Sequence, residues 1–243
     1  MQTTRRGPAQ VRRAGVAEGG VRRPAARLLA WWAVLLVVML ALGWLASRVV
    51  TRSELGHAET EVSTELASDR TPAWNDATRI LTLFGDTLPV ILVGLVAATV
   101  ARVVLHRWRE PALIAAALLG EVTIFLLVTL LIERNRPPVP KLDDSPPTSS
   151  FPSGHTAAAL VLYGSLAVIA WSRLRSVPAR ALAAVLAVAL PLLVGAARVY
   201  RGMHFVTDVL GGLVLGAAWL AAAVHGVGRA APSTDPPRAR GAA

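Results

Sequence analysis

The sequence contains no cysteine, only two tyrosines and four phenylalanines, and a single lysine, Lys141. Without cysteine the protein has neither disulfide bonds nor thiolate chemistry. Charge is also scarce, because charged residues make up 16% of the chain and hydrophobic residues 54%. This balance argues against an ordinary soluble domain of similar length and indicates an integral membrane protein.

Long apolar runs are abundant, and six of them approach the roughly 17–25 residues that a membrane-spanning helix needs. They cover residues 28–47, 80–101, 111–132, 156–172, 181–197 and 204–224. The first is longer than the apolar core of a signal peptide, and no clear cleavage site follows it, so we expect a retained helix. The sequence therefore predicts an all-α fold, a bundle of six transmembrane helices, with a short surface helix at residues 53–69.

The net charge of +10 could indicate nucleic-acid binding, but its placement favours a membrane protein without a nucleic-acid partner. Arginines gather in residues 1–27, between the second and third spans, between the fourth and fifth, and after the sixth. These places share one side, which the positive-inside rule assigns to the cytoplasm. We therefore expect both termini to be cytoplasmic. Residues 1–27 and 227–243 are predicted as disordered tails around one membrane domain, residues 28–226.

Three polar stretches meet the predicted outer ends of the spans. Residues 133–137 read ERNRP, residues 152–155 read PSGH, and residues 197–208 read ARVYRGMHFVTD. The topology alone brings these stretches to the same level of the membrane. The proline-rich loop that joins the first two is stiff, which suits a built site better than a tether.

In the PSGH stretch, Ser153 is a good residue type to begin a helix, whose first N–H groups suit an anion. Gly154 has no side chain, so a phosphate oxygen could come close. Alone, however, PSGH could be an ordinary helix start followed by the structural histidine His155.

The arginines and the second histidine add to this interpretation. Arg136, Arg198 and Arg134 carry guanidinium groups that match phosphate oxygens, although arginines at span ends are more often headgroup anchors. His204 and Asp208 are four residues apart and share a helix face, so the carboxylate could orient the ring for attack on phosphorus. Alone, this pair could equally be a surface hydrogen bond or half of a metal site.

The order RP, PSGH and R-x5-H-x3-D resembles the signature of the type 2 phosphatidic acid phosphatase (PAP2) superfamily, over about residues 80–225. The resemblance implies a six-helix membrane phosphatase whose site faces outward. It implies that His204 is the nucleophile, that Asp208 orients it, and that His155 protonates the leaving oxygen and then activates water. It also implies phosphate binding by Arg136, Arg198, Ser153 and Gly154.

Two positions depart from that pattern. The lysine expected seven residues before Arg136 is Thr129, and the serine expected before Arg198 is Ala197. We expect Arg134 or Lys141 to supply the missing charge. The alternative for Lys141 is a solvated loop charge paired with a neighbouring aspartate.

Lipid phosphates fit a site at headgroup depth, and phosphatidate, phosphatidylglycerol phosphate and undecaprenyl diphosphate all stay open as substrates. We expect no metal or other cofactor, because arginines and helix amides can neutralise the transferred group. A lipid-phosphate binder or flippase is the alternative. A haloperoxidase is not expected, because the haloperoxidases of the superfamily are soluble and this chain is predicted to span a membrane. Asp86 and Glu121 fall within predicted spans, where carboxyl groups are either functional or structurally hydrogen-bonded. Oligomeric state is open.

Overall fold

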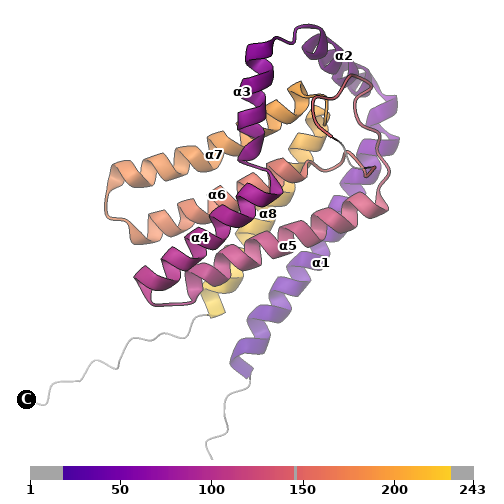
Figure 1. Ribbon diagram of the computed structural model, residues 1–243. Helices are drawn as coiled ribbons and strands as arrows, with labels where there is room; N and C mark the ends of the chain where they lie inside the picture. The colour runs from indigo at the N-terminus through magenta and orange to yellow at the C-terminus, as the bar shows by residue number, and fades with distance from the viewer. Residues whose placement is uncertain (1–18, 145–146, 231–243) are drawn as a thin grey trace, which may run out of the picture.

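The computed structural model describes residues 19–144 and 147–230, and in these residues all regular structure is helical (Figure 1). Six of the helices are long and apolar enough to cross a membrane. They are α1 (Gly19–Arg48), α4 (Thr87–Leu105), α5 (Arg109–Leu131), α6 (Gly154–Arg173), α7 (Val177–Tyr200) and α8 (Val206–Ala230). The predicted bundle of six transmembrane helices is confirmed.

Helix α6 is the centre of the bundle, since it contacts α4, α5, α7 and α8. Its buried face contains small residues such as Ala157 and Ala159, which let neighbouring backbones approach closely. Gly212 of α8 is one such neighbour, and a Cβ atom there would lie 2.4 Å from the carbonyl oxygen of Ser153. This close approach fixes the start of α6 against the start of α8.

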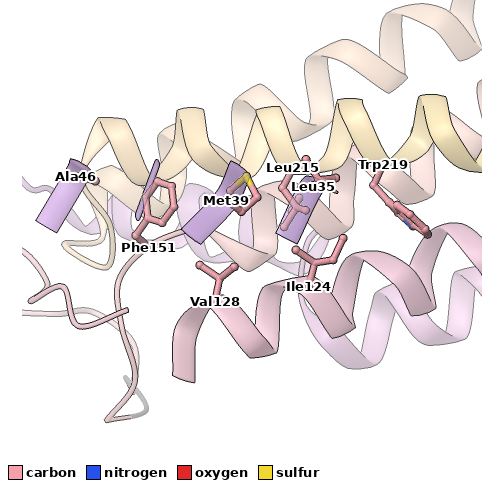
Figure 2. Packing of buried hydrophobic residues seen from close by; sticks show 9 residues of the cluster. Leu35, Met39, Ala46, Ile124, Val128, Phe151, Leu215 and Trp219 are labelled. Carbon is pink, nitrogen blue, oxygen red and sulfur yellow. The ribbon is translucent and has the colours of Figure 1, made fainter. Parts of the chain in front are cut away.

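Helix α1 packs against α8 and α5 and shares one hydrophobic cluster with them (Figure 2). Met39 of α1 and Ile124 of α5 are fully buried there, and Phe151 inserts from the loop before α6. At the other end of the cluster, Trp219 donates to the carbonyl oxygen of Ala117 at 2.9 Å. Phe151 therefore anchors the polar loop to the apolar core.

The second span begins later than predicted. Residues 80–83 belong to a separate helix, α3 (Pro72–Leu83), and α4 starts at Thr87. Asp86 ends the intervening turn, where its carboxylate accepts a hydrogen bond from the Thr87 N–H at 3.2 Å. Asp86 is thus the N-cap of α4 at the end of the bundle that also contains the start of α6, and not a charge within the span.

Two shorter elements precede α3. They are the 3₁₀ turn η1 (Val50–Arg52) and α2 (Glu54–Ser68), which is the predicted surface helix. Ser53 precedes α2, but its hydroxyl donates to the Val50 carbonyl oxygen and does not cap the helix. In Figure 1, α2 and α3 lie at one end of the bundle, close to the loop between α5 and α6.

The predicted tails fall mostly outside the described residues, which end at 230 and begin at 19. Helix α1 starts at Gly19, nine residues before the predicted span, and α8 continues to Ala230. Residues 19–27 and 227–230 are therefore helical, and the predicted disorder of residues 1–18 and 231–243 stays a prediction.

Candidate functional site

A pocket of about 390 Å³ lies where α4, α5 and α6 meet the loop before α6. Its polar end is formed by His155, His204, Arg136, Arg198 and Gly154. Its remaining wall is mainly apolar and includes Val90, Ile91, Leu118, Leu119, Val122 and Phe125. The pocket thus joins a cationic end to an apolar channel between helices.

The start of α6 agrees with the prediction, because Gly154 is its first residue and Ser153 its N-cap. The Ser153 hydroxyl, however, is fully buried and lies 3.0 Å from the hydroxyl of Thr156, outside the pocket lining. A Cβ atom on Gly154 would lie 2.8 Å from the ring of Phe125. The glycine therefore makes room for a neighbouring ring as well as leaving the helix amides uncovered, and Ser153 is placed behind the wall.

His204 follows a turn at Gly202, whose φ of +74° is a conformation that glycine adopts without strain. The Nδ1 atom of His204 lies 2.7 Å from the carbonyl oxygen of Ser150. A carbonyl oxygen can only accept, so Nδ1 holds the proton and Nε2 keeps its lone pair. Burial lowers the pKa of His204, and the negative charge of Asp208 offsets this only in part. The ring is therefore neutral at pH 7.

Asp208 is further from the ring than we expected. Its Oδ2 atom lies 3.7 Å from Nδ1 of His204 and accepts from the Phe205 N–H at 2.8 Å. We expected the Asp208 carboxylate to orient the ring by bonding to one of its nitrogens, but in the structure Nδ1 donates to the Ser150 carbonyl oxygen instead. Asp208 acts on the ring by its charge and by holding the turn that contains it.

Arg134 donates to Oδ1 of Asp208 and is 95% buried, so it lies behind the turn that contains His204 and not in the pocket. Its other Nη atom donates to Glu59 at 3.0 Å. Glu59, from α2, also accepts from the Thr207 N–H at 2.6 Å. The buried carboxylates of Glu59 and Asp208 need a cation nearby, and Arg134 supplies it. Arg134 is therefore unavailable to a phosphate.

Glu59 is the site residue that the sequence did not reveal. It belongs to a run of acidic residues in α2 that resembles a solvent-exposed helix surface, yet it is only 5% exposed. No spacing in the sequence connects residue 59 with residue 207. Only the packing of α2 over the start of α8 makes the contact.

Two guanidinium groups have a donor to spare at the pocket. Arg136 donates through Nη1 to the Met203 carbonyl oxygen at 2.7 Å, and Arg198 donates to Asp143 at 2.8 Å. The Nε atoms of both arginines, like that of Arg134, are buried and have no hydrogen-bond partner among the described residues. Burial also lowers the pKa of Arg136. Arg134 does not line this pocket, so the indication of an anion site comes from the guanidinium groups of Arg136 and Arg198 that line it beside the two histidines.

Asp143 accepts hydrogen bonds from Arg198 and Arg201. Burial pushes the pKa of Asp143 upward, but the hydrogen bond from Arg201 and the charges of both arginines outweigh it, so the pKa is lowered. Arg201 also donates to the Leu142 carbonyl oxygen at 3.0 Å. Arg201 therefore braces the loop, and Asp143 balances the charge of Arg198.

Lys141 lines a neighbouring open hollow of about 830 Å³, together with Thr129, Arg134 and Arg136. It does not line the pocket that contains the histidines. The structure thus places neither candidate for the missing lysine in that pocket, because Arg134 is bound to carboxylates and Lys141 faces the hollow. Arg136 is the cation that the two cavities share.

One carboxyl group lines the pocket, and a second lies next to one of its histidines. Asp86 has its Oδ1 atom 3.4 Å from Nε2 of His155, and its side chain is 48% exposed. Glu121 lines the apolar part of the pocket and is only 3% exposed. Asp86 is thus positioned to influence His155 from the water side, whereas Glu121 lies among apolar side chains.

Comparison with known proteins agrees with this architecture. Residues 111–231 match the PAP2 superfamily. A segment of 90 residues is 42% identical to phosphatidylglycerophosphatase B from Bacillus subtilis (strain 168) and covers 35% of this chain and 42% of that protein. The match therefore spans less than half of that relative.

A solved structure from the same organism extends the likeness to most of the fold. It is described as the first transmembrane PAP2-type phosphatidylglycerolphosphate phosphatase, and it superposes with a TM-score of 0.68 at 23% identity. The superposition covers 83% of this chain and 94% of that chain. At this identity the likeness concerns the fold.

Proposed function

The chain belongs to the PAP2 superfamily, and on that premise we propose that it is a membrane phosphatase that hydrolyses lipid phosphates through a phosphohistidine intermediate. One observation carries the proposal. The pocket brings His155 and His204 together with the guanidinium groups of Arg136 and Arg198. A phosphoryl group supplies the acceptor oxygens that guanidinium groups bind best.

In the first step, Nε2 of His204 attacks phosphorus and the bond to the leaving oxygen breaks. His155, in its protonated form, gives its proton to that oxygen and the alcohol leaves. In the second step, His155 takes a proton from water, whose oxygen attacks phosphorus and breaks the P–N bond. Inorganic phosphate leaves, and both histidines return to their starting state.

Charge on the transferred group is neutralised by Arg136, Arg198 and the first N–H groups of α6, a preorganised set of donors. The Ser150 carbonyl keeps the proton of His204 on Nδ1 throughout, so that Nε2 is the reactive atom. These groups do not require a divalent cation. Activity should therefore persist in EDTA and be inhibited by vanadate, which mimics five-coordinate phosphorus.

The apolar wall of the pocket supports lipid substrates, since a tail could stay among apolar side chains while its phosphate meets the histidines. The relative named phosphatidylglycerophosphatase B favours phosphatidylglycerol phosphate among the candidates. The direct test is release of inorganic phosphate by the purified protein from phosphatidate, phosphatidylglycerol phosphate and undecaprenyl diphosphate. Headgroup binding without phosphate release would support the binder or flippase instead.

We place the site on the extracytoplasmic side. The connections between α4 and α5 and between α6 and α7 are rich in arginine, as in Arg107, Arg109, Arg173 and Arg175, and they lie at the ends of the helices opposite the pocket. The positive-inside rule then puts the pocket outside. Because the chain has no cysteine, Asp144→Cys and Ser176→Cys each create a unique label site, and both positions are exposed.

In intact cells, a membrane-impermeant maleimide should label only the Asp144→Cys protein, and both should react after lysis. Labelling of Ser176→Cys alone in intact cells would reverse the proposed orientation. Ser150, in the same loop, is unsuitable for labelling because it is fully buried and its carbonyl oxygen holds His204.

A further inference from the structure

A buried carboxyl group without a partner lies in the wall of the pocket. Glu121 of α5 is 3% exposed and lines the same pocket as His155 and His204. Among the described residues, none forms a hydrogen bond or ion pair with it. A carboxyl group that lines a pocket and has no protein partner is positioned to hydrogen-bond a ligand there.

A second buried carboxyl on the same helix shows what a structural role looks like. Glu110 is also 3% exposed, but Nε of Arg173 donates to its Oε1 atom at 2.9 Å. That pair ties the start of α5 to the end of α6. Among the described residues, no cation is paired with Glu121 in this way.

The depth of Glu121 follows from helix geometry. It precedes Phe125 by one turn, which is about 5.4 Å along the axis. The Phe125 ring packs against Gly154, next to His155. The carboxyl group therefore lies about one helical turn deeper than the phosphate end of the pocket. Its neighbours in the wall, Leu118 and Val122, are apolar, so an unpaired charge there would be costly and the group is in its neutral acid form.

A neutral carboxylic acid both donates and accepts a hydrogen bond. At this depth it faces the part of the substrate that follows the phosphate. In a glycerol-based lipid phosphate, that part has oxygen atoms, either ester groups as in phosphatidate or a hydroxyl as in phosphatidylglycerol phosphate. In a polyprenyl monophosphate, the same part is hydrocarbon, whereas in a polyprenyl diphosphate it is the second phosphate.

We propose that Glu121 hydrogen-bonds a glycerol oxygen of the substrate and thereby selects glycerol-based lipid phosphates over polyprenyl monophosphates. This inference rests on the proposed phosphatase activity and adds the substrate class. A hydrocarbon substrate would leave the acid unsatisfied in the pocket, so the same group that favours glycerol lipids disfavours polyprenyl chains.

The test compares kcat/KM for short-chain phosphatidate, short-chain phosphatidylglycerol phosphate and farnesyl phosphate, in the wild type and in Glu121→Leu. Loss of one hydrogen bond in a water-poor pocket predicts a drop of roughly tenfold on the glycerol substrates, with farnesyl phosphate unchanged or improved. A drop on phosphatidate alone identifies an ester as the bound oxygen, and a drop on phosphatidylglycerol phosphate alone identifies the hydroxyl. Glu121→Gln keeps a neutral donor and should retain most of the activity.

Glu110→Gln is the matched control, because it changes a buried carboxyl of the same helix outside the pocket. It should alter kcat/KM for all three substrates by one common factor. An equal change for all three substrates in Glu121→Leu, or no change, would overturn the inference while leaving the phosphatase proposal intact. If the wild type releases phosphate from none of the substrates, it is the phosphatase proposal that fails.

Discussion

The two histidines of the pocket are held in contrasting ways. His204 is 4% exposed, its Nδ1 atom donates to a backbone carbonyl oxygen, and a layer of buried ion pairs lies behind its turn. His155 has 26% of its side chain exposed, and the carboxylate beside it, Asp86, is 48% exposed. The contrast fits the two proposed tasks, because a nucleophile needs one fixed orientation and an acid–base group must exchange protons with water.

The largest effect is expected at the fixed histidine. His204→Ala removes the proposed nucleophile, so no covalent intermediate can form and kcat should fall by about four or more orders of magnitude. Phosphate release measures this directly. His225→Ala, at the exposed far end of α8, is the control and should stay active. Substantial turnover by His204→Ala would remove the basis for the covalent mechanism.

The exposed histidine should matter less, and in a way that depends on the leaving group. His155→Ala should lower kcat on a lipid phosphate by roughly 10²–10⁴, the usual contribution of general acid–base catalysis. With an alkylated nitrophenyl phosphate, whose leaving group needs no proton, His155→Ala should still form the phosphohistidine in the first step. A burst of nitrophenol with trapped phosphohistidine would then be seen, and absence of a burst would argue against a role for His155 in the second step.

Next come the groups behind His204. Glu59→Gln and Arg134→Lys should each lower kcat by roughly 10- to 100-fold with little change in KM, since they loosen Asp208 and the turn without touching substrate. The double variant should lose less than the product of the two factors, because the residues form one network. Glu61→Gln, on the exposed face of the same helix, is the control. Additive losses would show that the network is not a unit.

Asp86→Asn should have a small effect, about two- to fivefold on kcat/KM. The carboxylate is half exposed, so its influence on His155 is screened by water and salt. The difference between wild type and variant should shrink further in 0.5 M salt. Asp76→Asn, an exposed carboxylate of α3, should show no such salt-dependent difference. A loss as large as that of His155→Ala would mean that Asp86 itself moves a proton.

The smallest predicted change is a displacement of the pH profile. Burial lowers the pKa of His204 and Asp208 partly restores it, so the ring loses its proton below the ordinary value of about 6.5. A protonated His204 cannot attack phosphorus, so kcat/KM should fall on the acid side only as the pH drops below that value. Asp208→Asn should move the limb to still lower pH and lower the plateau. Comparing the two proteins on one substrate cancels the titration of the phosphate near pH 6.

Features that depend on local pattern were predictable from the sequence. The six spans follow from apolar runs, and the start of α6 follows from Ser153 and Gly154. Contacts between distant segments were not predictable. Nothing local reveals that Arg134 would be taken by Glu59 and Asp208, or that a carbonyl oxygen would hold His204. Such contacts depend on how the helices pack, and that packing is determined jointly by residues far apart in the chain.

The break between α3 and α4 was missed for a related reason. Residues 80–101 are apolar enough to look continuous, and the turn at Phe84–Asp86 is visible only once Asp86 caps the next helix. Gly85 allows the turn to lie against α6, since a Cβ atom there would be 2.5 Å from the His155 carbonyl oxygen. A hydropathy profile indicates which residues lie in the membrane, but it does not show a break between two helices at the membrane surface.

The contact between Glu59 and Thr207 connects a helix at one end of the bundle to the pocket. Helix α2 lies outside the segment that matches the superfamily, yet its Glu59 carboxylate holds the turn that contains His204. A binding partner or an antibody that pulls this helix away would leave Arg134 with Asp208 and Thr207 and would loosen the turn that holds the His204 ring. Inhibition would then need no access to the pocket, only binding to α2.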